Sequence, residues 1–145
     1  MKLSRRKARM VALEMLYQFD MADGKMDDII RAQIKGKDLP NGAKDFIFQL
    51  VKGVLGHRDE IDKLIEIRAE HWSLDRITVI DRNILRLAIF ELLYCEDVPF
   101  KVIIDEAVEL GKTYGTEDSG AFINGVLDKI GRGISARKEE IRKIA

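Results

Sequence analysis

The sequence predicts an all-α protein, built as a single compact domain of six to seven helices. Along most of the chain, apolar residues recur every three or four positions, which is the spacing of a helix with one buried face. The 145 residues include two prolines and few runs of β-branched residues, so strands are not favoured. We expect one helical domain over residues 1–131, followed by a charged segment, 132–145, that continues as helix or frays.

The first part of the chain predicts two helices. Ser4 is a suitable N-cap for the first, whose apolar stripe reaches Phe19. A turn that contains Gly24 separates it from a short second helix, which carries three isoleucines on its inner side. Residues 39–42, Leu-Pro-Asn-Gly, then break the helical pattern.

A long apolar pattern begins after Asn41, a suitable N-cap, and continues to Ile65. It fits one helix or two, because Gly53 and Gly56 each weaken its middle by about 1 kcal/mol relative to alanine. We favour one long helix, which ends at a corner formed by residues 72–74.

The most hydrophobic stretch, from Ile80 to Tyr94, is expected to form the central helix, because apolar residues occupy nearly all of its sides. Thr78 precedes it and begins a pattern like a capping box, in which Asp81 replaces the usual glutamate. Two further amphipathic helices follow, the second capped by Thr116 and ending near Gly131.

Positive charge is concentrated at the N-terminus of a chain that is neutral overall, with 25 basic and 25 acidic residues. Within the first nine residues there is no acid, and there are five cations: Lys2, Arg5, Arg6, Lys7 and Arg9. Such segregation is typical of proteins that bind a polyanion, and these side chains would neutralise phosphates without reading base sequence. The alternative is that the basic start only keeps the protein soluble.

Residues 112–124 offer aromatic rings for stacking and polar groups for base edges. Tyr114 is expected at a helix end, Asp118 and Ser119 in the first turn of the next helix, and Phe122 one turn after Asp118. A helix N-terminus also presents free backbone N–H groups to a phosphate. Periodicity alone favours Phe122 as a core residue and Asp118 as a helix-capping residue, so both interpretations stay open.

The sequence indicates no catalytic residue, metal site or cofactor site. His57 and His71 lie 14 residues apart, outside the spacing of helical metal ligands, and the acids of residues 105–109 are expected to form a solvated face. Cys95, the single cysteine, is expected to be a buried thiol and suits a reducing cytoplasm. No apolar run approaches the ~20 residues of a membrane span, and no signal peptide follows the basic start.

Four stretches resemble the NusB family of transcription antitermination factors. They are residues 5–19 (RRKARMVALEMLYQF), 81–93 (DRNILRLAIFELL), 97–110 (DVPFKVIIDEAVEL) and 114–129 (YGTEDSGAFINGVLDK). The resemblance is specific in the C-terminal half and loose over residues 21–70. It implies an all-helical fold of two packed three-helix bundles, without catalytic activity.

The resemblance also implies partners. Members of the family pair with NusE, a protein of the small ribosomal subunit, and the pair binds the boxA element of nascent ribosomal RNA transcripts. With other Nus factors they help to build a complex on RNA polymerase that resists termination. Some members form homodimers that cover the RNA site, and the sequence does not decide whether this chain does so.

Carried over to this sequence, the resemblance gives roles to individual residues. The five cations of the basic start would hold the RNA backbone. Bases or ribose would be contacted by Arg86, Tyr114, Asp118, Ser119, Phe122 and Asn124. NusE would be contacted by Tyr17, Asp75 and Asp81. Some members place an RNA-stacking tyrosine before the corner at Trp72; here none is present, and Arg68 would stack in its place unless the contact is missing.

Two other functions stay open. NusB-like domains also precede methyltransferase domains in ribosomal-RNA cytosine methyltransferases, although this sequence shows neither a nucleotide-type glycine loop nor a catalytic cysteine motif. A purely structural helical domain is the second alternative, and it would bind no RNA even when a partner protein is present.

Overall fold

A computed structural model describes the backbone of residues 2–21, 25–35, 37, 39, 42–69 and 73–144, and their side chains except those of 2–4, 26, 33, 139 and 141–144. Within these ranges the chain is helical and contains no strand, as predicted. The elements are α1 (Lys2–Met21), α2 (Met26–Ile34), α3 (Ala43–Gly56), α4 (Arg58–Arg68), a 3₁₀ helix η1 (Leu74–Arg76), α5 (Val79–Tyr94), α6 (Phe100–Tyr114) and α7 (Ser119–Ile144).

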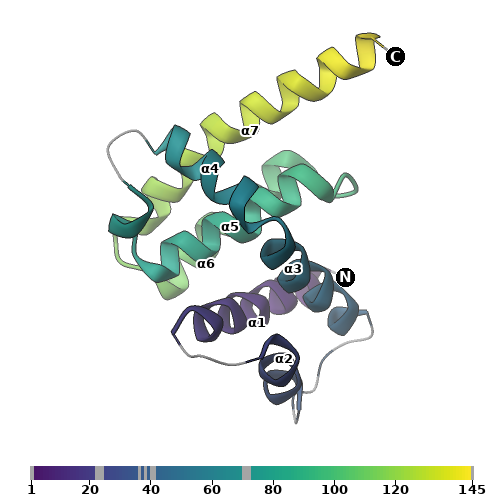
Figure 1. Cartoon of the computed structure of the whole chain (residues 1–145), viewed down its shortest axis with the longest axis vertical. Helices are drawn as coiled ribbons and strands as arrows, with labels where there is room; N and C mark the ends of the chain where they lie inside the picture. The colour runs from purple at the N-terminus through teal and green to yellow at the C-terminus, as the bar shows by residue number, and fades with distance from the viewer. Residues whose placement is uncertain are drawn as a thin grey trace.

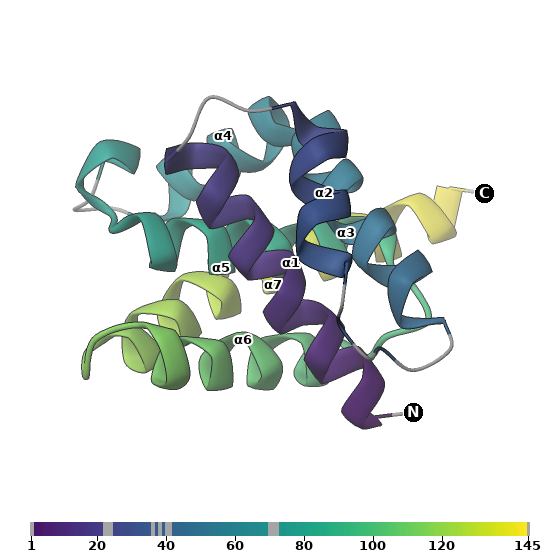
Figure 2. The same ribbon diagram turned by 90° about the horizontal axis from the view of Figure 1, so that it is seen from below.

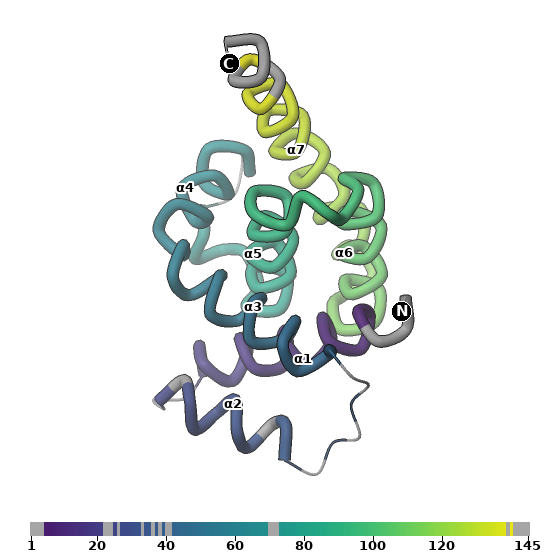
Figure 3. Tube along the Cα trace, turned by 90° about the vertical axis from the view of Figure 1, so that its right-hand side faces the viewer, coloured from purple at the N-terminus to yellow at the C-terminus, as the bar shows by residue number. Residues whose placement is uncertain are grey.

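The helices form two groups that meet at α5, as Figures 1 and 3 show. In the first group α1 packs against α2 and α3. In the second group α5, α6 and α7 pack against one another, and α4 covers α5 and α7. Since α1 and α3 also pack on α5, this helix belongs to both groups. The expected architecture of two packed bundles is confirmed.

The central position of α5 is confirmed by its burial. Nearly all of its residues from Asp81 to Leu92 are buried, including the charged side chains of Arg86 and Glu91. At its N-terminus, Thr78 Oγ1 accepts a hydrogen bond from the backbone N–H of Asp81 at 3.2 Å, which is one half of a capping box. The expected start of this helix is therefore correct.

The prediction of one long helix after residue 42 is wrong. The chain forms α3 and α4, which are separated by His57 with φ −116° and ψ 20°. The imidazole of His57 stacks on Tyr94 of α5, with 4.3 Å between ring centroids. The break lets both helices pack on α5, because the chain changes direction at this stack.

Two other helix boundaries differ from the expectation. The first helix begins at Lys2, ahead of the predicted cap Ser4, and α7 begins at Ser119 and not after Thr116. The last helix continues past Gly131 to Ile144, which is one of the two courses expected for the charged segment. Its distal part remains attached to the body because Lys138 Nζ donates to the carbonyl of Leu92 at 3.0 Å.

Three expectations fall outside the described residues: the turn at Gly24, the cap Asn41 and the corner at Trp72. The residue that precedes α3 is Gly42, whose φ of 86° lies in the left-handed region that favours glycine. Among the described residues, none of the helices has the length and apolar character needed to cross a membrane.

Helices α3 and α5 approach each other closely at Gly53. A Cβ atom added there would overlap the ring of Phe90, which is itself buried. Glycine is therefore required by space at this position, although it weakens an isolated helix. A matched glycine occurs at Gly125 in α7, where an added Cβ would meet no atom within 4 Å.

We expect Gly53→Ala to lower the free energy of unfolding by about 1–3 kcal/mol, because overpacking against Phe90 outweighs the better helix propensity of alanine. The control Gly125→Ala is expected to raise it by about 0.5–1 kcal/mol. Urea denaturation of both variants measures the two effects. Equal stabilisation by both would contradict the close approach of α3 and α5.

Candidate nucleic-acid interface

Two residues of the basic start form ion pairs with α6 and with the segment just before it, along a line called here the α1–α6 seam. Figure 2 shows the N-terminal parts of α1 and α6 close to each other. Arg5 Nη2 lies 3.0 Å from Asp97 Oδ2, and this hydrogen bond lowers the pKa of Asp97. Arg6 donates to both carboxylate oxygens of Glu106 at 2.9–3.3 Å, which raises the pKa of Arg6. The arginine side chains remain 43% and 51% exposed, so both can contact a ligand.

Arg9 lies on the inner side of the same helix, and its position corrects the expectation that it holds the RNA backbone. Its side chain is 5% exposed and donates to both oxygens of Glu91, at 2.8 and 2.9 Å. Glu106 lies 3.6 Å away on the other side. Burial acts to lower the pKa of Arg9, but the hydrogen bonds and charge of Glu91 outweigh it and the pKa is raised. Arg9 is therefore a core residue.

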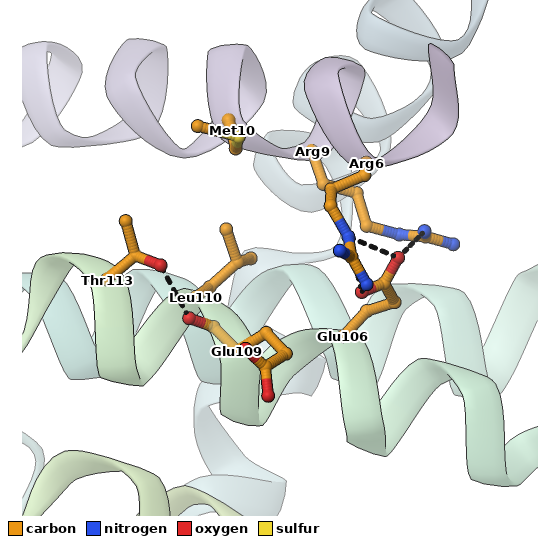
Figure 4. Close-up of a pocket in the computed structure, with 7 residues that line it drawn as sticks. All are labelled: Arg6, Arg9, Met10, Glu106, Glu109, Leu110 and Thr113. Atoms are coloured by element: carbon orange, nitrogen blue, oxygen red, sulfur yellow. Dashed lines mark hydrogen bonds and ion pairs between the residues drawn. The ribbon is translucent and has the colours of Figure 1, made fainter. Parts of the chain in front are cut away.

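Glu106 consequently bridges the surface and the interior, as the close-up in Figure 4 shows. It contacts the half-exposed Arg6 and the buried Arg9, and it is itself buried. The expectation of a solvated acidic face therefore fails for Glu106, while Asp105 and Glu109 are exposed. A periodic pattern cannot reveal this arrangement, because the partner charges come from a helix about 100 residues away in sequence.

Arg86 is a second predicted RNA contact that the structure buries. Its guanidinium donates to both oxygens of Asp62 at 2.8 and 3.0 Å, and to Asp20 Oδ2 at 3.1 Å. It also donates to Asn83 Oδ1 at 3.1 Å. With these partners from α1, α4 and its own helix, Arg86 joins three helices and is not available to a base.

The corner between α6 and α7 continues the seam. Tyr114 is half-buried, and its hydroxyl donates to Glu14 Oε1 of α1 at 3.3 Å; burial raises its pKa, and Glu14 adds to the shift. Ser119 is buried, and its Oγ accepts a hydrogen bond from the backbone N–H of Thr116 at 2.9 Å. Ser119 therefore orders the corner itself, which corrects its assignment as a base contact. Asp118 is exposed.

Phe122 is half-buried at a pocket of about 210 Å³ between η1, the start of α5 and the α6–α7 corner. The lining residues are Arg76, Ile77, Thr78, Asp81, Thr116, Asp118, Ser119 and Phe122. Asp81 Oδ1 is buried and has no hydrogen-bond partner among the described residues. The pocket therefore brings a residue assigned to NusE, Asp81, next to two assigned to RNA, Asp118 and Phe122.

Sequence reasoning did not single out Arg76 and Thr116 for this pocket. Arg76 lies on the short helix η1, which has no periodic pattern long enough to show an inner face. The sequence predicts Thr116 as a helix cap, and in the structure it lines the pocket.

The other assigned residues take varied positions. Tyr17 is 37% exposed near the end of α1, and Lys7, Asp75 and Asn124 are exposed. Lys2 is helical, but its side chain lies outside the described part. Arg68 lines a groove with α7 and the end of α5, which shares no lining residue with the pocket of Phe122.

The residues considered for catalysis take structural positions. Burial raises the pKa of the Cys95 thiol to about 11, so this buried residue is protonated at neutral pH, as expected of a structural thiol. Among the described residues no group of three potential metal ligands occurs, and His71 lies outside them.

Comparisons with known proteins agree on one family. A model of the NusB family matches residues 6–132. The transcription antitermination protein NusB of Myxococcus xanthus is 49% identical over 132 residues, which cover 88% of this chain and 94% of the relative. The protein of the same name from Anaeromyxobacter dehalogenans is 49% identical over 138 residues, which cover 94% and 96%.

Similarity to solved structures indicates the same family. NusB of T. maritima is 40% identical, with a TM-score of 0.83 over 88% of this chain and 90% of that chain. A chain from the crystal structure of the antitermination factors NusB and NusE in complex with dsRNA is 31% identical. It has a TM-score of 0.82 over 92% of this chain and 99% of its own.

We expect Arg9→Met to lower the free energy of unfolding by about 3–5 kcal/mol, because it leaves Glu91 buried and without its cation. Arg5→Met is the control: it removes an exposed ion pair of the same helix and should change stability little. Urea denaturation compares the variants. Similarly small effects of both changes would show that Arg9 is not part of the core.

Proposed function

The chain belongs to the NusB family, and we propose that it is a transcription antitermination protein that binds RNA together with NusE. Relatives that match nearly the whole chain carry the name of transcription antitermination protein, and a structural neighbour is described with NusE and dsRNA. The RNA that we propose is the boxA element of nascent ribosomal RNA transcripts. Other Nus factors and RNA polymerase complete the proposed assembly, which places the protein in the cytoplasm.

The continuity of the α1–α6 seam with the pocket of Phe122 carries the assignment of residues. The seam begins at the Arg5–Asp97 pair, passes the Arg6–Glu106 pair and reaches Tyr114, which directly precedes the corner. Backbone contacts and base contacts would thus follow one another along a single strand of RNA.

The electrostatics of the seam support a contribution of a protein partner to RNA affinity. The three arginines Arg5, Arg6 and Arg9 are matched within 4 Å by Asp97, Glu106 and Glu91. The seam therefore attracts phosphates less strongly than five free cations would. We propose that Arg5 and Arg6 share their guanidinium groups between carboxylate and phosphate, and that NusE supplies additional affinity by extending the surface.

Selectivity is proposed to come from the corner. The half-buried ring of Phe122 would stack on one base, while the exposed Asp118 and Asn124 accept or donate hydrogen bonds at base edges. Tyr114 would form the boundary between this region and the backbone contacts.

The proposed NusE surface adjoins the RNA surface. It includes the exposed residues Tyr17 and Asp75, and Asp81, whose buried oxygen Oδ1 lacks a partner among the described residues. An N–H donor from NusE would satisfy this oxygen. Because Asp81 and Phe122 line the same pocket, binding of NusE would also order the base site.

We further propose that the protein acts by binding and not by catalysis, and that the RNA-binding domain ends near residue 131. A methyltransferase assay with ribosomal RNA distinguishes this function from the enzymatic alternative. A titration of boxA RNA with and without NusE distinguishes it from a purely structural domain, which would show no binding in either case.

Arg6→Ala is expected to weaken the binding of boxA RNA and of a scrambled RNA to the same extent, because a phosphate contact does not read sequence. The slope of log K against log[salt] should fall by about 1. Fluorescence titration of the NusE complex at several salt concentrations measures both quantities. Arg132→Ala is the matched control, since Arg132 is also an exposed arginine paired with a carboxylate, Asp128, at 3.1 Å. An unchanged slope for Arg6→Ala would contradict the role of the seam.

Phe122→Ala is expected to weaken the binding of boxA RNA by about 1–3 kcal/mol, because the aromatic ring that stacks on a base is lost. The binding of a scrambled RNA should weaken by less. Phe122→Leu keeps an apolar side chain against the core and lacks the aromatic plane, so it separates stacking from packing. Thermal unfolding of both variants monitors the fold. Equal losses on the two RNAs would contradict the assignment of Phe122.

A further inference from the structure

The distal half of α7 forms a groove with α4 that the proposed function does not use. The groove has a volume of about 600 Å³, and the end of α5 contributes Leu93 and Tyr94 to it. Its lining residues from α4 fall within residues 60–68 and those from α7 within residues 130–138. In both helices they follow the spacing i, i+3, i+4, i+7 and i+8, which defines one helical face about 12 Å long.

Apolar side chains are unusually exposed along this groove. Ile67 is 62% exposed and Tyr94 is 42% exposed, although both are large hydrophobic residues. Leu64 and Ile134 line the groove beside them and are half-buried against the core. A continuous apolar surface bordered by charged residues is typical of a site for another macromolecule.

The border of the groove is positively charged. Four cations and one carboxylate, Glu60, line it. No carboxylate of the described residues forms an ion pair with Lys63, Arg68 or Arg137, while Glu60 already accepts a hydrogen bond from Tyr94 at 2.8 Å. Desolvation of these cations by a partner would therefore require acidic groups from that partner.

We propose that the α4–α7 groove binds a short amphipathic helix of a partner protein, with apolar residues on one face and acidic residues along both borders. Two helical faces with an apolar floor between them fit the side chains of a third helix at i, i+3, i+4 and i+7. The length of the groove corresponds to about two helical turns of the partner. The apolar floor favours a peptide over RNA, because the phosphates of RNA would contact only the cations and leave the apolar floor without a partner.

Fluorescence anisotropy with a labelled synthetic helix of about 16 residues tests the proposal. The peptide carries leucines at i, i+3, i+4 and i+7 and glutamates beside them; a second peptide has lysines in place of the glutamates. The acidic peptide should bind about tenfold more tightly than the basic one. In the double variant Lys63→Glu/Arg137→Glu, the basic peptide should bind more tightly than the acidic one. Ile67→Glu should weaken the binding of the acidic peptide about tenfold or more.

Met21→Glu is the matched control, because Met21 is 61% exposed but lies at the end of α1, outside the groove. Equal binding of both peptides, or equal effects of Ile67→Glu and Met21→Glu, would overturn the proposal. Light scattering that shows a dimer abolished by Ile67→Glu would assign the groove to a second copy of this chain. Loss of RNA binding in the Lys63→Glu/Arg137→Glu variant would assign it to RNA, and either result overturns the proposed occupant.

Discussion

The requirement that two buried charges of α5, Arg86 and Glu91, must find partners inside the protein determines how the helices are arranged. This helix is covered by α1, α3, α4, α6 and α7, so these two side chains cannot reach water. Arg86 takes its partners from Asp62 of α4 and Asp20 of α1, and Glu91 takes Arg9 of α1. A displaced α1 would leave buried charges unpaired at two places, which is costlier than the loss of apolar contacts alone.

These internal pairs set the outer surface. Because Arg9 and Asp20 attach α1 to α5 at two points, Glu91 and Arg86, the residues of α1 between and beside them have one orientation. Arg6 then meets Glu106, and Glu14 meets Tyr114. Glu106 contacts Arg6 on the surface and Arg9 in the core, so a phosphate that competes for Arg6 acts on a carboxylate that the fold itself uses. In the proposed complex, binding and stability would thus be coupled at this residue.

The sequence predicted the helices whose apolar pattern is dense. It identified α5 and the face of α6. The role assigned to Phe122, which lines the pocket at the α6–α7 corner, stays a prediction. Sequence reasoning failed for Arg9, Arg86, Glu106 and Ser119, all of which are buried, because a periodic pattern assigns polar residues to the outside. The burial of Arg9, Arg86 and Glu106 depends on partners that are distant in sequence, and no local signal describes such partners. The break at His57 has the same origin, since it depends on the stack with Tyr94. Ser119 differs, because its partner Thr116 is only three residues away.

The uninterrupted course of α7 has a consequence for larger assemblies. Phe122 near its start and Ile134 farther along are separated by twelve residues of one helix, which corresponds to about 18 Å of axial rise. A helix without a hinge transmits orientation as well as distance. Two molecules held at these positions would therefore be kept at a fixed spacing and rotation, and the rigid backbone alone would define their mutual geometry.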